Sequence, residues 1–223
     1  MFASARRTTV IVLVLALLAG SASALAAAGD ALIRAITLRQ PERVAILLDQ
    51  GVSPEAASRE AEYQGKSALM WAAETGQVDV IRMLLQYGAV VDRGNPKGGT
   101  ALMYAAVAGQ IEAIRALVAA GADPDHRVRH GWTPLLLATA KGHIETVRAL
   151  TGLGADPQTR DVYGWTLLMH ATDRADTAMM RTLIELGLDP RAADAAGIDA
   201  LTLAERSNRP ELVEMLRSAM KTP

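Results

Sequence analysis

The sequence contains no cysteine, very few aromatic residues and no excess of charge of either sign. The lack of cysteine excludes disulfide bonds, thiolate metal sites, cysteine nucleophiles and iron–sulfur clusters. The 23 Lys and Arg residues are balanced by 24 Asp and Glu residues, whereas a general nucleic-acid binder carries a basic excess. Half of the 223 residues are apolar although only one is Phe, so small aliphatic side chains must fill the core of a globular chain.

The first 28 residues differ in composition from the rest. Arg6 and Arg7 precede an apolar run, which is followed by a stretch rich in Ala and Ser. This order is typical of a secretory signal peptide, with candidate cleavage sites after Ala24, Ala26 and Ala28. We therefore expect a signal peptide over residues 1–28, whose removal changes the formal charge from −1 to −3 because both arginines are lost. An uncleaved membrane anchor is the alternative, since residues 8–28 carry no charge.

The remaining sequence repeats itself every 33 residues. Residues that accept hydrogen bonds from the first turn of a helix recur at this spacing, each two residues after a glycine: Ser67, Thr100, Thr133, Thr166 and Asp199. A second set of glycines predicts the end of a short first helix: Gly76, Gly109 and Gly142. A third set predicts the end of a longer second helix: Gly88, Gly121, Gly154 and Gly187. Each unit therefore predicts a turn, two helices and a loop.

Apolar residues lie on one face of each predicted second helix, as in Val78, Ile81, Leu84 and Leu85, or Ile111, Ile114, Leu117 and Val118. One unit cannot cover this face alone, so neighbouring units must stack. We predict an all-α solenoid over residues 29–223, with about six helix-turn-helix repeats and divergent capping repeats at its ends. The expected units are about 29–62, 63–95, 96–128, 129–161, 162–194 and 195–220.

The segment Gly131-Trp132-Thr133-Pro134-Leu135-Leu136-Leu137-Ala138, with Gly142-His143 and Asp156-Pro157 after it, resembles the ankyrin repeat. The resemblance covers about residues 29–220, and the chain is similar to exported bacterial ankyrin-repeat proteins. It implies a non-enzymatic module that binds a protein partner in the periplasm, as an accessory or an immunity-like inhibitor of an enzyme. One departure from the family pattern is the loss of the glycine between the helices at Ala175 and Asn208.

The resemblance assigns recognition to the turns, which project as fingers, and to the ends of the first helices, on a concave surface. Aromatic and basic residues, which dominate binding energy at interfaces, occupy many of these positions. We expect ten of them to contact the partner: Tyr63, Lys66, Lys97, Arg129, His130, Trp132, Lys141, Tyr163, Trp165 and Arg174. Trp132 and Trp165 either touch the partner or brace neighbouring turns.

Cations gather near the fingers of the middle units, and they form either a solvated surface or a docking surface for an acidic partner. They are Arg93, Lys97, Arg127, Arg129, Lys141, Arg160 and Arg174.

No set of residues has the pattern of a catalytic, cofactor or metal site. His126 and His130 offer two ring nitrogens beside cationic neighbours, which disfavours a bound metal ion. We expect a structural role for His143 and a packed or partly exposed position for His170. Residues 94–100 superficially resemble a phosphate loop but lack its lysine before the threonine, which predicts a finger. We expect a monomer with no cofactor, metal or nucleic-acid partner; the alternatives are a membrane-anchored scaffold and an enzyme that uses His130 or His170.

Overall fold

The computed structural model describes residues 26–60 and 65–221, which form six pairs of antiparallel helices. The first helices of the pairs are residues 26–37, α3 (Ala68–Glu74), α5 (Ala101–Ala108), α7 (Pro134–Lys141), α9 (Leu167–Asp173) and α11 (Ala200–Arg206). The second helices are α2 (Pro41–Asp49), α4 (Val78–Gln86), α6 (Ile111–Ala119), α8 (Ile144–Gly152), α10 (Thr177–Glu185) and α12 (Pro210–Ala219).

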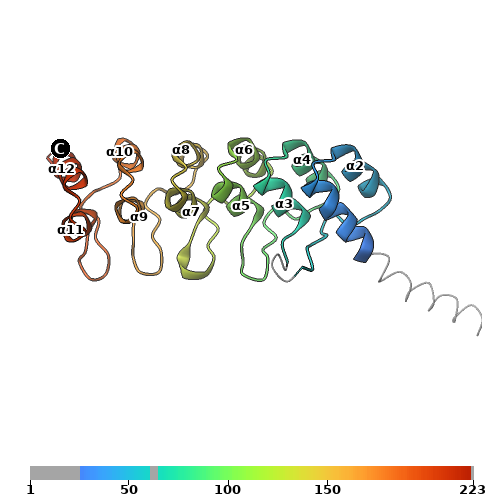
Figure 1. The fold of residues 1–223 in the computed structure, drawn as a ribbon, viewed down its shortest axis with the longest axis horizontal. Helices are drawn as coiled ribbons and strands as arrows, with labels where there is room; N and C mark the ends of the chain where they lie inside the picture. The colour runs from blue at the N-terminus through green and yellow to red at the C-terminus, as the bar shows by residue number, and fades with distance from the viewer. Residues whose placement is uncertain (1–25, 61–64, 222–223) are drawn as a thin grey trace, which may run out of the picture.

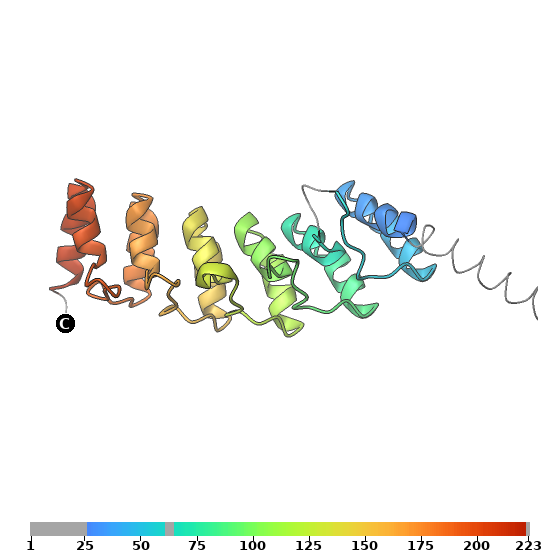
Figure 2. The same ribbon diagram turned by 90° about the horizontal axis from the view of Figure 1, so that it is seen from below.

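The pairs stand side by side in one elongated row (Figure 1). The first helices form one layer and the second helices another, and the loops that lead into the first helices project beyond the first layer (Figure 1). Each helix packs mainly on the other helix of its pair and on its counterparts in the neighbouring pairs, as Figure 2 also shows. The described residues contain no β-strand. The prediction of an all-α solenoid is confirmed.

Alanines in register let the first helices approach one another closely. Ala72, Ala105, Ala138, Ala171 and Ala204 are fully buried between these helices. A larger side chain at any of these positions has no space without moving a neighbouring helix. The stack therefore depends on small residues at its centre, with leucine and isoleucine filling the space between the layers.

The buried face of the second helices differs from the prediction. Val80 and Ala113 are buried, whereas Val78 and Ile111, the first residues of their helices, are half-buried. Leu85 and Val118, which were also expected in the core, are half-buried as well. Ile81, Leu84, Ile114 and Leu117 are buried as predicted.

The predicted capping residues begin the first helices of pairs two to six. Side-chain oxygens of Ser67, Thr133, Thr166 and Asp199 accept a hydrogen bond from the backbone N–H three residues later, at 2.7–3.3 Å. Thr100 occupies the same place, but its hydroxyl makes no hydrogen bond within the described part of the chain. The capping prediction is thus confirmed at four positions and wrong at one.

The break between the helices of a pair needs a left-handed backbone, with or without glycine. Gly76, Gly109 and Gly142 have φ of 67°, 69° and 78°. Ala175 and Asn208, which replace glycine in the last two pairs, keep φ of 55° and 51°. The turn geometry therefore survives the change of residue, at the cost of strain that a Cβ atom brings to this region.

Replacing Ala175 with glycine is expected to raise the free energy of unfolding by about 1 kcal/mol, because it relieves this strain. The matched control is Ala149→Gly in the middle of α8, which should lower the free energy of unfolding by about 1 kcal/mol. Urea unfolding followed by circular dichroism measures both changes. A loss of stability in Ala175→Gly would show that the alanine is not strained.

The last pair of helices carries a polar outer surface, whereas the first pair exposes Leu38 and Ile46. Glu205, Arg206, Glu211, Glu214 and Arg217 are exposed on the last pair, as is expected of a terminal repeat. The expected signal peptide lies mostly outside the described residues, and residues 26–28 belong to the first helix. Among the described residues, no helix is both long enough and apolar enough to cross a bilayer.

Candidate functional site

The loops before α5, α7, α9 and α11 form fingers that are each closed by a backbone hydrogen bond at the same register. The N–H groups of Asn95, Val128, Asp161 and Asp194 donate to the carbonyl four residues later, at 2.8–3.2 Å. In three fingers, the side-chain Oδ1 of Asn95, Asp161 or Asp194 also accepts two N–H groups of the turn, at 2.9–3.0 Å. The side chain at this register position therefore sets the shape of the finger.

The finger at residues 94–100 is not a phosphate site. Asn95 Oδ1 accepts the N–H groups of Lys97 and Gly99 at 2.9 Å. A phosphate loop needs such N–H groups free to donate to the ligand. The prediction that this segment is a finger is confirmed.

The finger before α7 has Val128 where the other three have asparagine or aspartate, and its backbone forms a different type of turn. Residues Arg129–Gly131 form a single 3₁₀ turn in which His130 has a left-handed φ of 62°. The carbonyl of His130 accepts the N–H of Val162 in the next finger at 3.0 Å, and the His130 ring stacks on Tyr163 with centroids 6.4 Å apart. The tips of these two fingers are therefore joined to each other.

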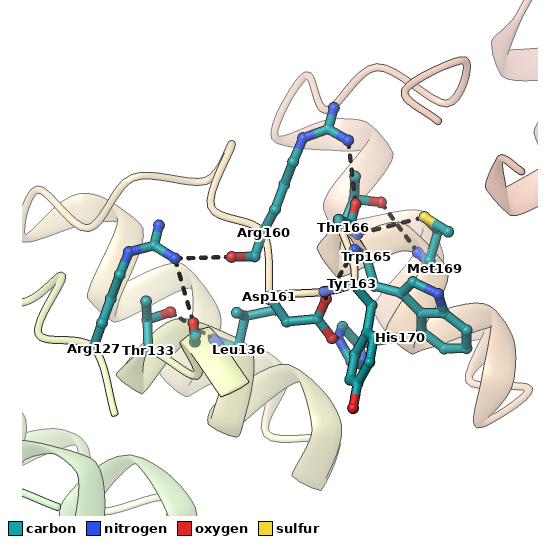
Figure 3. Close-up of polar contacts among 12 residues, drawn as sticks. Arg127, Thr133, Leu136, Arg160, Asp161, Tyr163, Trp165, Thr166, Met169 and His170 are labelled. Carbon is teal, nitrogen blue, oxygen red and sulfur yellow. Dashed lines mark hydrogen bonds and ion pairs between the residues drawn. The ribbon is translucent and has the colours of Figure 1, made fainter. Parts of the chain in front are cut away.

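Two of the cations expected near a docking surface tie the fingers together instead. Arg127 donates to the carbonyl of Arg160 at 2.8 Å (Figure 3), and Arg160 in turn donates to the carbonyl of Ala193 at 2.7 Å. Arg93 pairs with Glu55 at 2.6 Å. These three guanidinium groups are engaged inside the chain, which makes them weaker candidates for a docking surface than the cations without such contacts.

Lys66 also differs from the prediction. It is only 5% exposed, and its ammonium group lies 3.5 Å from the centroid of the Trp71 ring and 4.8 Å from that of Tyr104. It also bonds to the carboxylate of Glu74. Lys66 is therefore held against α3 and α5 and does not present a charge to a partner. Tyr63, another expected contact, lies outside the described residues.

Trp132 and Trp165 pack on His170, which lies on α9 (Figure 3 shows Trp165 and His170). Their ring centroids are 4.9 Å and 5.3 Å from that of the histidine, and both indoles are half-buried. The Nε2 atom of His170 lies 3.2 Å from Oδ2 of Asp161, and the two side chains are only 11% and 5% exposed. The bracing role considered for the two tryptophans is confirmed, as is the packed position of His170.

Asp161 is the residue at this site that sequence reasoning missed. One oxygen of its carboxylate holds the finger and the other faces His170. The repeat offered a signal, because Asp161 is in register with Asn95 and Asp194 and lies four residues before a tryptophan.

Burial lowers the pKa of His170 below its ordinary value, and the nearby carboxylates of Asp161 and Asp173 oppose this shift only in part. The unfolded chain therefore takes up a proton near pH 6.5, before the folded protein does. Between the two pKa values the unfolded state holds more protons, so the free energy of unfolding falls as the pH falls.

We expect stability at about pH 8 to exceed that at about pH 5, with part of the difference due to His170. In the variant His170→Leu, the difference in stability between the two pH values should be smaller. Leucine is chosen because Leu137 occupies the same position in the preceding repeat. Urea unfolding at the two pH values measures the effect. An equally steep decline in the variant would contradict this role of His170.

The exposed residues of this side gather on the fourth and fifth pairs. We call the following six the basic–aromatic patch: Arg129, His130, Lys141, Val162, Tyr163 and Arg174. Val162 and Tyr163 are 62% and 66% exposed. Arg129, Lys141 and Arg174 form no ion pair with any described residue. Five of the ten predicted contact residues thus lie on one exposed surface, and Lys97 is exposed on the preceding finger.

The other histidines are engaged with the backbone of preceding units. Nε2 of His143 lies 2.9 Å from the carbonyl oxygen of Val107, which confirms its structural role. Nε2 of His126 lies 3.1 Å from the carbonyl oxygen of Gly98, so it is not aimed at a ligand shared with His130. No group of three potential metal-binding side chains occurs among the described residues.

A comparison with protein families agrees with this geometry. A family model described as ankyrin repeats, in three copies, matches residues 1–95 and 90–161. No curated protein matches the chain. Because the matched residues make up more than half of the sequence, and the paired helices and fingers repeat along it, the chain belongs to the ankyrin repeat family.

Proposed function

We propose that this protein is an exported, monomeric binding module that holds an acidic protein partner on its finger side. The family supports a protein-interaction role without enzymatic activity. The observation that carries the proposal is the basic–aromatic patch, where exposed cations that pair with no acid among the described residues lie beside an exposed tyrosine. A surface of this kind attracts carboxylates and supplies an aromatic contact.

On the second helices, several exposed arginines lie close to acids, although Arg181 forms no ion pair with a described residue. Arg82 and Arg115 lie 3.6 Å and 3.7 Å from acids on their own helices, and Arg148 pairs with Glu185 at 2.7 Å. Their charges are thus partly compensated within the chain. This contrast favours the finger side over the outer side as the docking surface.

Photo-crosslinking in cells tests the face. A photoreactive phenylalanine derivative replaces Tyr163 on a finger or, as the control, Tyr87 at the end of α4, the two being exposed tyrosines on different layers. We expect a discrete crosslinked protein from position 163 and none from position 87. Crosslinking from position 87 alone would place the partner on the outer side and overturn the proposal.

The location is tested by the mass of the purified protein. We propose export to the periplasm, guided by the N-terminal segment, so the mature chain should be about 2.5–3 kDa lighter than the full sequence. A full-length mass in the membrane fraction would instead support the anchored scaffold. We propose that the partner is an enzyme; its activity with and without the module distinguishes an accessory from an inhibitor.

A further inference from the structure

The cations of the finger side differ along the row in whether they are exposed and free of an ion pair with a described residue. In the second and third pairs, Lys66 is buried against Glu74 and Arg93 is paired with Glu55, so Lys97 is the one predicted contact cation there that is exposed and forms no ion pair with a described residue. In the fourth and fifth pairs, Arg129, Lys141 and Arg174 have no ion-pair partner in the part of the chain that the structure describes. A carboxylate partner therefore gains most at the fourth and fifth pairs.

Two of these three cations are also brought together by the fold. Lys141 and Arg174 end α7 and α9, two adjacent helices. An Nη atom of Arg174 would lie only 3.4 Å from a Cβ atom added to Gly142, so its guanidinium group reaches back to the residue that follows Lys141. Acids also lie near this pair of cations: Oδ2 of Asp176, the N-cap of α10, would lie 3.2 Å from the same Cβ atom, and Asp173 is exposed, whereas Asp161 is buried against His170. No carboxylate of these residues forms an ion pair with Lys141 or Arg174.

The apolar part of the patch lies at the finger tips. Val162 and Tyr163 are both more than 60% exposed, and the stack of Tyr163 on His130 holds the phenol ring in place. Between these tips and the helix ends lie the half-buried rings of Trp132, Trp165 and His170. Charge thus occurs on both sides of an aromatic strip.

We propose that the basic–aromatic patch recognises an extended acidic segment of a partner chain that also carries an aromatic side chain. This inference rests on the proposed function and names the chemistry of the partner. An extended chain can direct carboxylates to Arg129 on one side and to Lys141 and Arg174 on the other while an aromatic ring packs beside Tyr163. A nucleic acid is disfavoured because the whole chain has a net charge of −1.

The probe is a random copolymer of glutamate and tyrosine, which supplies both kinds of side chain in an unfolded chain. Polyglutamate and a single-stranded oligonucleotide of similar length are the comparisons. We expect the purified protein to bind the copolymer about tenfold more tightly than polyglutamate in calorimetry. We also expect the oligonucleotide to bind more weakly than the copolymer, and added salt to weaken copolymer binding because the cations are exposed.

Two charge-matched triple variants locate the site. Arg129→Gln, Lys141→Gln and Arg174→Gln together should weaken copolymer binding by about tenfold or more. The control triple is Arg82→Gln, Arg115→Gln and Arg181→Gln, which removes the same charge from exposed positions on the second helices and should change binding by less than about twofold.

The aromatic contribution is tested separately. Tyr163→Ala should weaken binding of the copolymer and leave binding of polyglutamate unchanged, whereas Tyr87→Ala should affect neither. The inference is overturned if the protein does not bind the copolymer, if both triple variants lose affinity equally, or if the oligonucleotide binds as tightly as the copolymer. Should position 163 still crosslink to a protein in cells, the proposed function stands and only the chemistry of the partner is wrong.

Discussion

Replacing Ala138 with aspartate is expected to lower the free energy of unfolding by about 4 kcal/mol. Ala138 lies on α7 and is fully buried where this helix packs on α5 and α9. An aspartate here would place a charge without a partner among apolar side chains. Since each pair of helices is stabilised by its neighbours, the loss should spread to the pairs on both sides. Chemical denaturation measures the total, and amide hydrogen exchange shows where protection is lost.

Ala178→Asp is the matched control, because Ala178 is exposed in the first turn of α10. A carboxylate near the start of a helix is neutral or slightly stabilising, by about 0.5 kcal/mol. If Ala138→Asp were as stable as this control, or lost protection only in the end pairs, the close packing of the first helices would not hold the row together.

Replacing Asp161 with alanine should lower the free energy of unfolding by about 3 kcal/mol. The substitution leaves the N–H groups of Tyr163 and Trp165 without the acceptor that lies at 2.9 Å, and it removes the carboxylate that faces His170. The finger should lose its shape, and the exposed Tyr163 should lose its fixed position. We therefore expect weaker binding of the copolymer in addition to lower stability.

Asp161→Asn provides the sharp comparison. Asn95 occupies the same register in an earlier finger, where its side-chain oxygen accepts two N–H groups at 2.9 Å. Asparagine at position 161 should therefore keep the finger closed and cost only about 1 kcal/mol. Equal losses in the alanine and asparagine variants would mean that the negative charge, and not the hydrogen bonds to the turn, stabilises the finger.

The repeat made the helices and fingers predictable from the sequence, because caps, glycines and small residues have local roles. Asp199 caps its helix whatever lies further away, and Gly109 adopts the left-handed backbone that ends α5. Ala175 shows the limit of this reasoning. Its turn is preserved without glycine because the surrounding pairs hold the backbone in place.

The roles of the charged residues were harder to predict, because they depend on groups about one repeat away. Nothing in the sequence distinguishes Arg127 and Arg160 from arginines exposed to solvent. In the structure, however, each donates a hydrogen bond to a carbonyl 33 residues further along the chain. The burial of Lys66 was easier to predict from the sequence, because Trp132 and Trp165 occupy the same register position in later repeats. Whether the patch binds a partner depends on a molecule that the sequence does not describe.

Amide hydrogen exchange with and without the glutamate–tyrosine copolymer tests most directly where recognition takes place. We predict slower exchange on binding at the finger tips around residues 129–131 and 162–164 and at the ends of α7 and α9. Exchange in α4, α6 and α8 should not change. Protection confined to those second helices, or no protection anywhere in a saturated complex, would contradict recognition by the finger side.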